Sequence, residues 1–252
     1  MLKEIVIAIQ AYFQAHQFIK KHRLWKWILI PGILYATLFM VSMYYFGETA
    51  NHFIEWLSLR TGLKTWLDKI DSGWLGFFFT LGSLILWLVM IQFYFSLFKY
   101  LFLIVGSPLF AYLSEKTEAI LEGKEHHLSI AQLFKDIERG IRIAGRNCLW
   151  QTVYCIAILF GCAIPIVGMV APILALLVEC FYYGFSMLDY SMERQNKSAT
   201  VSINFIVNHK GLAIGNGIVF YSMHCIPVLG WVLAPAYAVV AATLSMHPLK
   251  NK

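Results

Sequence analysis

One apolar run constrains this sequence more than any other feature, because it is too long and too uniform for the core of a soluble domain. Residues 74–105 carry a single charge, Lys99, in 32 positions. A helix of that length measures about 48 Å, whereas the hydrocarbon core of a bilayer is about 30 Å thick. The sequence therefore predicts a transmembrane helix at 74–105 that tilts or projects into the cytoplasm. We expect Lys99 to extend to the interface there rather than to face a pore.

The whole chain has the composition of a membrane protein. It is 59% hydrophobic and only 13% charged, whereas soluble domains carry about 25% charged residues. The net charge of +6 is placed in short stretches beside apolar segments, which favours an anionic membrane face over nucleic acid as the partner. We therefore predict a single all-α integral membrane domain, residues 1–252, surrounded by membrane lipids.

A second span and the orientation follow from the N-terminal part of the chain. Residues 1–24 have apolar positions at helical spacing and predict an amphipathic helix on the membrane surface. A cluster of four cations without an acid follows at 20–26, and residues 25–47 are then apolar for long enough to cross the bilayer. By the positive-inside rule the N-terminus is cytoplasmic and 48–72 lies outside. We expect the C-terminus on the cytoplasmic side as well.

Residues 107–147 are predicted to form cytoplasmic helices. The tripeptide Gly106-Ser107-Pro108 is expected to end the preceding span, with Ser107 capping a new helix and Pro108 in its first turn. The segment balances six cations with six acids, so we interpret it as a mixed hydrophilic layer rather than a basic tail.

The second half of the chain contains an internal repeat. Residues 164–172 read Ile-Pro-Ile-Val-Gly-Met-Val-Ala-Pro, and residues 226–235 read Ile-Pro-Val-Leu-Gly-Trp-Val-Leu-Ala-Pro. Apolar segments flank each copy, which predicts two helical hairpins, at 148–190 and 211–247, with tips rich in proline and glycine. The expected tip residues are Pro165, Gly168, Pro172, Pro227, Gly230 and Pro235.

These tips lie in strongly apolar surroundings, where a break in the backbone is tolerated only if protein or water covers it. Paired, interrupted hydrophobic segments of this kind are typical of transport sites. The return arm of the second hairpin, 236–246, has only about 11 residues, too few to span a bilayer. This favours re-entrant, partly inserted hairpins. Two ordinary spanning hairpins with tight loops are the alternative.

One acidic residue lies inside the first hairpin. Glu179 occurs in the apolar stretch Leu-Leu-Val-Glu-Cys-Phe. A carboxyl group within a membrane helix is costly, so it is by default a functional hypothesis. Glu179 could pair with an arginine or sense a proton, or it could face water in a half-inserted hairpin.

No pattern indicates catalysis, a cofactor or a metal. Cys148, Cys155 and Cys162 repeat every seven residues, which places them about 10 Å apart along a helix, too far for a disulfide or a shared metal ion. The eight histidines show no ligand spacing, and the sequence has no Ser/His/Asp grouping or phosphate-binding loop. We therefore expect a protein that is not an enzyme and needs no cofactor or metal.

Several short motifs, in their order, resemble the CysZ-type sulfate permeases, which share a domain with the etoposide-induced 2.4 membrane proteins. The motifs are Trp27-Ile28-Leu29-Ile30-Pro31, Ser107-Pro108-Leu109 with Leu113-Ser114-Glu115, Asp189-Tyr190, and the two proline-tipped hairpins. The resemblance covers nearly the whole chain. It implies a multi-pass protein of the bacterial inner membrane that forms a homo-oligomer and takes up sulfate.

The resemblance also directs attention to the start of the first span. In the bacterial permeases a Gly-Leu/Ile-Arg stretch there binds sulfate, and the corresponding stretch here is Arg23-Leu24-Trp25, which has no glycine and a displaced arginine. From the residues alone, Arg23 and Lys26 form a candidate anion site, since cations at a helix N-terminus favour an anion. Membrane topology and contact with lipid headgroups are the other interpretation of these cations.

The function predicted from these observations is membrane transport of a small inorganic anion, with sulfate as the leading candidate. The alternative is a membrane scaffold or membrane-shaping protein that transports nothing. Surface helices and wedge-like hairpins would suit that role equally well.

Overall fold

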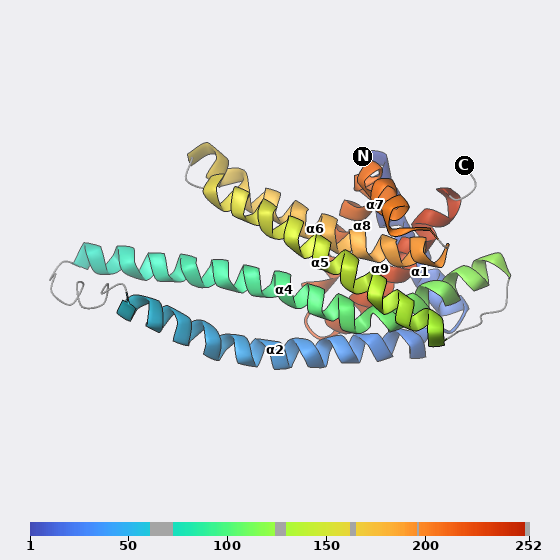
Figure 1. Cartoon of the computed structure of the whole chain (residues 1–252), viewed down its shortest axis with the longest axis horizontal. Helices are drawn as coiled ribbons and strands as arrows, with labels where there is room; N and C mark the ends of the chain where they lie inside the picture. The colour runs from blue at the N-terminus through green and yellow to red at the C-terminus, as the bar shows by residue number, and fades with distance from the viewer. Residues whose placement is uncertain (61–72, 124–129, 162–164, 196, 250–252) are drawn as a thin grey trace. The chain divides into compact units, whose positions relative to one another are not determined.

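The computed structural model describes residues 1–60, 73–123, 130–161, 165–195 and 197–249, and within these ranges the chain is helical with no strand. The all-α prediction is confirmed for this part of the chain (Figure 1). The elements are α1 (Leu2–Lys21), α2 (Trp25–Arg60), α4 (Gly73–Glu122), α5 (Ile130–Gly161), α6 (Pro165–Arg194), α7 (Ala199–Asn208), α8 (Lys210–His224), α9 (Leu229–Met246) and the 3-10 turn η1 (His247–Leu249).

Three segments among the described residues are long and apolar enough to cross a membrane: Trp25–Thr49, Val170–Glu193 and Leu229–Met246. The first covers the predicted span 25–47, and Pro31 lies inside α2 without ending it. The predicted span 74–105 lies within α4, although most of its side chains between residues 75 and 97 fall outside the described part of the chain.

The predicted helix break at Gly106-Ser107-Pro108 is wrong, because the 50-residue helix α4 runs through it and ends at Glu122. Aromatic packing across the proline turn supports the helix there. The rings of Phe102 and Phe110 meet edge to face with centroids 5.3 Å apart. A Cβ on Gly106 would come within 2.6 Å of the Phe110 ring, so the glycine allows that ring to lie against the helix. These contacts offset the amide donor that Pro108 lacks.

The chain divides into two compact units, and both α2 and α4 contribute to each. Unit 1 comprises Met1–Ala36 and Tyr100–Lys252, and unit 2 comprises Thr37–Lys99. Unit 2 pairs the two long helices: the Tyr94 hydroxyl donates to the Ser42 carbonyl at 2.5 Å, and its ring lies 4.6 Å from that of Phe46. Lys99 is buried, 6% exposed, so the prediction that it extends to the interface is wrong.

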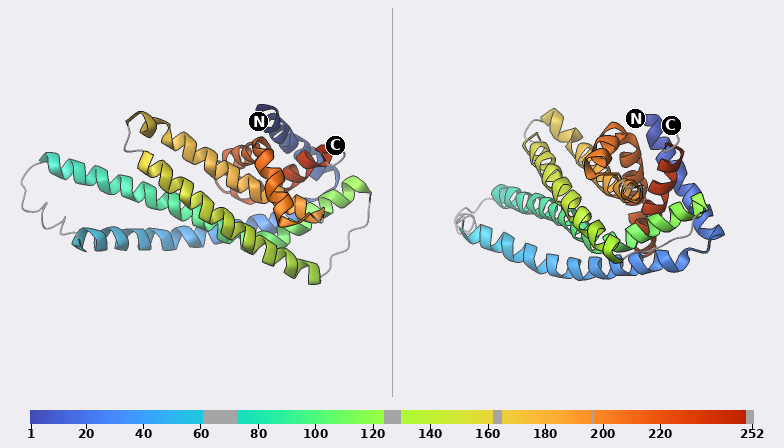
Figure 2. Two further views of the ribbon diagram at one scale, coloured as in Figure 1. Left: turned by 45° about the horizontal axis from the view of Figure 1, so that its top comes forward. Right: turned by 45° about the vertical axis from the view of Figure 1, so that its right-hand side comes forward.

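Helix α8 lies in the middle of unit 1 and packs against α6, α1 and α9 (Figure 2). Glycines bring α6 and α8 into backbone contact. A Cβ on Gly184 would lie 2.0 Å from the Ala213 carbonyl oxygen, and one on Gly217 would lie 2.1 Å from that of Cys180. No larger side chain fits at either position without moving the helices apart, which is how small residues serve in membrane helix packing.

Helix α1 coincides with the amphipathic helix predicted from the sequence, but one of its faces packs against other helices. The face of α1 that carries small side chains, including Ala8, Ala11 and Ala15, is buried against α8 and α9. The Tyr12 hydroxyl donates to the Asn216 carbonyl at 2.9 Å. The opposite face exposes apolar side chains such as Phe13, which is 71% exposed. The helix is therefore part of the bundle on one side and available to lipid on the other.

The two predicted hairpins correspond to α5–α6 and α8–α9, and the turns are shorter than the sequence suggested. Pro172 and Pro235 lie inside α6 and α9, so they belong to the arms rather than to the tips. Because α9 has 18 residues, the return arm of the second hairpin is long enough to cross by length, about 27 Å. The shortness of that arm therefore no longer favours re-entrant hairpins, which stay a prediction.

Candidate functional site

The buried polar group that most demands an explanation is the carboxylate of Glu179. It lies in α6 within the candidate span Val170–Glu193, and only 5% of the residue is exposed. Glu179 therefore faces the protein interior. An ionisable group in that position requires hydrogen-bond partners, because burial without them is very unfavourable.

Both carboxylate oxygens of Glu179 accept hydrogen bonds from neutral side chains on neighbouring helices. The Gln151 amide on α5 donates to Oε1 at 2.5 Å, and the Tyr221 hydroxyl on α8 donates to Oε2 at 3.0 Å. Gln151 is itself held by a third donor, because the Tyr100 hydroxyl on α4 donates to Gln151 Oε1 at 2.6 Å. We call Tyr100, Gln151, Glu179 and Tyr221 the Glu179 network.

The network has a defined direction. Because Tyr100 donates to the Gln151 oxygen, the amide nitrogen of Gln151 must point toward Glu179. Gln151 and Tyr100 are 1% and 4% exposed, so water has little access to either bond. Hydrogen bonds to a charged group contribute about 1.5–3 kcal/mol each. The arrangement therefore suits an ionised carboxylate held where four helices meet.

A second polar cluster lies farther along α6, near the C-terminal end of that helix. Arg139 on α5 pairs with Asp189 at 2.8 Å and with Glu193 at 3.7 Å. Ser202 on α7 donates a short hydrogen bond to Asp189 Oδ1. These contacts tie α5, α6 and α7 together, and both carboxylates are buried. Pairing with Arg139 makes that burial tolerable.

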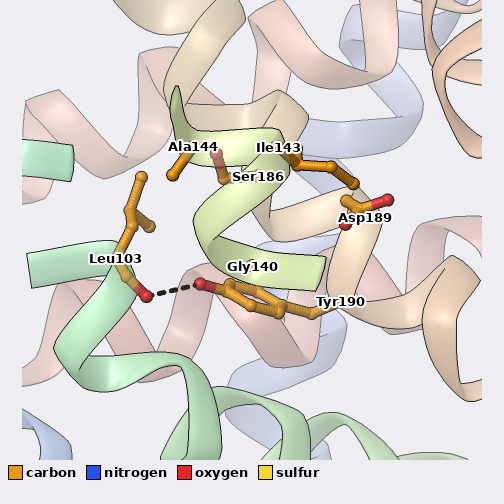
Figure 3. A pocket seen from close by; sticks show the side chains of 7 residues that line it. All are labelled: Leu103, Gly140, Ile143, Ala144, Ser186, Asp189 and Tyr190. Carbon is orange, nitrogen blue, oxygen red and sulfur yellow. Dashed lines mark hydrogen bonds between the residues drawn. The ribbon is translucent and has the colours of Figure 1, made fainter. Parts of the chain in front are cut away.

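Beside this cluster is a cavity of about 10 Å³ lined by residues of α4, α5 and α6 (Figure 3). The Tyr190 hydroxyl closes one side by donating to the Leu103 carbonyl at 2.8 Å. The cavity forms beside Gly140 and Ala144, because neither residue has a side chain large enough to fill it. The volume is close to the minimum for one water molecule, so this cavity is too small for an oxyanion.

The predicted anion site lies at the junction of α1 and α2. Arg23 and Lys26 are both exposed there, and neither belongs to the Glu179 network. The backbone of Arg23 has φ 52, in the left-handed region that favours glycine. The turn between α1 and α2 therefore has a glycine-like conformation at Arg23, although the side chain there is cationic.

The start of α2 is anchored beside these cations. Leu24 is buried, 2% exposed, and the Lys116 ammonium of α4 lies 4.5 Å from the centroid of the Trp27 ring. A cation over an indole face is favourable. This contact fixes the first turn of α2 against α4, so Arg23 and Lys26 are presented to solvent from a supported turn.

The predicted tip residues fall into different environments. Pro227 lies in the turn between α8 and α9 and is exposed, whereas Gly230 is buried. A Cβ on Gly230 would lie 1.8 Å from the Met223 carbonyl oxygen, so glycine is required for the chain to turn there. The Trp231 indole also donates to the His224 carbonyl at 3.1 Å, which closes the turn.

The first tip is only partly described. Residues 162–164 lie outside the described residues, and Pro165 and Gly168 lie in the first turns of α6, with their side chains outside the described part of the chain. Pro172 is exposed on α6. The second tip lies close to α2, since a Cβ on Gly32 would come within 1.9 Å of the Val232 carbonyl oxygen.

Comparison with known proteins assigns the chain to a family. The family described as "Sulfate transporter CysZ/Etoposide-induced protein 2.4" matches residues 11–235. A protein named "Sulfate transporter CysZ" from Pseudomonas syringae pv. tomato is 25% identical over 222 residues, 87% of each chain. One of the same name from Pseudomonas aeruginosa is 24% identical over 220 residues, 86% of this chain and 85% of the relative. The chain belongs to the sulfate transporter CysZ/etoposide-induced protein 2.4 family.

Proposed function

We propose that this protein carries sulfate across the inner membrane of a bacterium, as a multi-pass homo-oligomer with both termini in the cytoplasm. The observation that carries the proposal is the match to curated relatives named sulfate transporters over 87% of both chains. The candidate spans are consistent with a transmembrane path. The same comparison gives no support to a scaffold that transports nothing.

Sulfate recognition is proposed at the junction of α1 and α2. Two exposed cations, Arg23 and Lys26, flank the first residue of α2, Trp25. The first amides of a helix have no acceptor within the helix and carry partial positive charge. Together they offer a dianion two charged side chains and free backbone donors. Neighbouring Lys20 and Lys21 would raise the local concentration of anions.

Substitutions at Arg23 separate its charge from its backbone conformation. Arg23→Gly removes the charge and relieves a left-handed backbone that costs about 1–2 kcal/mol for other residues. Arg23→Lys keeps the charge and the strain, and Arg23→Ala keeps only the strain. The measurement is the uptake of radiolabelled sulfate into proteoliposomes that contain each variant. We expect Arg23→Gly and Arg23→Ala to raise the sulfate concentration for half-maximal uptake at least about tenfold. We expect Arg23→Lys to have a much smaller effect.

The matched control is Lys3→Gln, which removes an exposed cation from the other end of α1. Wild-type uptake in that variant shows that local charge at the junction, and not overall charge, matters. Unchanged uptake in Arg23→Gly and in Lys26→Gln would place sulfate recognition elsewhere in the protein.

A further inference from the structure

Helices α5 and α6 lie side by side (Figure 2), and Arg146 is the last charged residue of α5. Residues 147–161, which complete the helix, contain no Asp, Glu, Lys or Arg. Three large apolar side chains of this part are exposed on the outside of the helix: Leu149, Val153 and Phe160. Such a face suits contact with lipid chains. Arg146 therefore lies where α5 changes from a charged helix to an apolar one.

The charge of Arg146 is not balanced by a neighbouring acid. Arg139 and Arg142, on the same helix, both pair with carboxylates. Among the residues that the structure describes, no carboxylate pairs with Arg146, although its side chain is only partly exposed. A partly buried cation at the edge of an apolar surface is stabilised by an anion that comes to it. The anion that balances Arg146 must therefore come from outside the described chain.

Neutral groups hold the Arg146 guanidinium in place. Its Nη1 donates to Asn147 Oδ1 at 3.0 Å, and its Cζ lies 5.8 Å from the centroid of the Phe185 ring on α6. Asn147 and Phe185 are both buried, so the guanidinium rests on the protein core. Its other N–H groups donate to no described residue. An arginine held in this way presents a planar set of donors to an external acceptor.

Aromatic side chains continue from Arg146 along the apolar part of α5. Trp150 and Tyr154 follow Arg146 at intervals of four residues, which places the three side chains in one stripe. The Trp150 and Tyr154 ring centroids are 6.4 Å apart, and Tyr154 lies 6.3 Å from the ring of Tyr182 on α6. Both α5 rings are about half exposed. Trp and Tyr are enriched at the level of lipid headgroups, so the stripe indicates that Arg146 lies at this level.

The arrangement favours one class of ligand. Arginine binds phosphate oxygens through two parallel hydrogen bonds, and the exposed apolar face beside Arg146 suits the acyl chains of a phospholipid. The predicted topology places this end of α5 at the cytoplasmic leaflet, where anionic lipids attract cations. A free oxyanion would use the guanidinium but not the aromatic and aliphatic side chains beside it.

We propose that Arg146 binds the phosphate of an anionic phospholipid on the α5–α6 hairpin, with Trp150 and Tyr154 beside the glycerol and the first acyl carbons. The phosphate supplies the negative charge that Arg146 lacks. Since the Arg146 side chain also contacts Phe185, the bound lipid stabilises the contact between α5 and α6. This inference does not rest on the proposed transport of sulfate.

The test measures lipid binding without any transport. Purified protein in detergent is titrated with phosphatidylglycerol, and native mass spectrometry gives the fraction of chains that carry a first bound lipid. We expect Arg146→Gln to raise the lipid concentration for half-maximal binding at least about fivefold, the effect of one cation near an anionic surface. Arg142→Gln removes a cation of the same helix that is already paired with Glu138. It is the matched control and should bind as wild type does.

Two more measurements keep the proposal testable if Arg146→Gln does not fold. Arg146→Lys keeps the charge but loses the planar set of donors, so its affinity should lie between those of wild type and Arg146→Gln. Phosphatidylcholine has the same phosphate without a net charge, so the wild-type protein should bind it at least about threefold more weakly.

Equal binding of phosphatidylglycerol by wild type and Arg146→Gln, or equal affinity of the wild-type protein for the two lipids, would overturn the proposal. Inorganic phosphate and sulfate, each added at millimolar concentration, distinguish a lipid from a free oxyanion. The proposal predicts that neither displaces the bound phosphatidylglycerol. Displacement by either ion would assign Arg146 to a free oxyanion and overturn the lipid site.

Discussion

The contact between α6 and α8 predicts a large effect from a single added methyl group. Gly217→Ala would place a Cβ 2.1 Å from the Cys180 carbonyl oxygen, whereas ordinary contacts begin at 3.4 Å. The helices must therefore separate by more than about 1 Å, since backbone atoms on both sides cannot turn away. Cys180 is the neighbour of Glu179, and Tyr221 lies one helical turn beyond Gly217.

The magnitude follows from three terms. Overpacking costs about 1–3 kcal/mol. Separating the helices stretches the 3.0 Å bond from Tyr221 to Glu179 to about 4 Å, beyond hydrogen-bond range, which costs about 1.5–3 kcal/mol more. Alanine regains up to about 1 kcal/mol of helix propensity. The net expectation is a loss of about 1.5–5 kcal/mol.

Thermal unfolding in detergent, followed by helical circular dichroism, measures this loss. Gly145→Ala in α5 is the matched control, because a Cβ there meets nothing within 4 Å and the same propensity gain applies. We expect Gly217→Ala to melt well below wild type and Gly145→Ala to melt at or slightly above it. A Gly217→Ala protein as stable as Gly145→Ala would refute the backbone contact and the geometry of the Glu179 network built on it.

Two further predictions concern the long helices and the second polar cluster. Because α4 runs unbroken through Pro108, Pro108→Ala restores a helical hydrogen bond and should raise the melting temperature by the equivalent of about 1–3 kcal/mol; a decrease would indicate that the helix depends on the proline. Arg139→Leu removes the cation shared by the buried Asp189 and Glu193 and should cost about 3–5 kcal/mol in denaturant unfolding. Arg142→Leu, which breaks an exposed pair, should cost less than about 1 kcal/mol, and equal losses in the two variants would contradict this account.

The sequence identified the class of fold and one part of the site, because both depend on local pattern. Long apolar runs predict helices wherever they occur, and a carboxyl group such as Glu179 is conspicuous among apolar neighbours. Gln151, Tyr100 and Tyr221 were not identified, since neutral polar and aromatic residues are common in membrane helices. Only the packing of α4, α5, α6 and α8 brings these residues to Glu179.

The wrong predictions came from giving local breaking signals too much weight. Pro108 and Pro235 suggested ends of helices, but packing around them carries the helix past each proline. The glycines of α8, in contrast, carried a packing signal that the sequence analysis did not use. Gly211 and Gly215 are spaced as small residues are at close helix contacts, and this signal could have predicted that α8 lies at the centre of unit 1.

The most direct test of the central proposal is the uptake of radiolabelled sulfate into proteoliposomes that contain the purified, folded wild-type protein. The proposal predicts saturable uptake above empty vesicles, with weaker competition from chloride and phosphate than from unlabelled sulfate. Uptake no greater than in empty vesicles would contradict it.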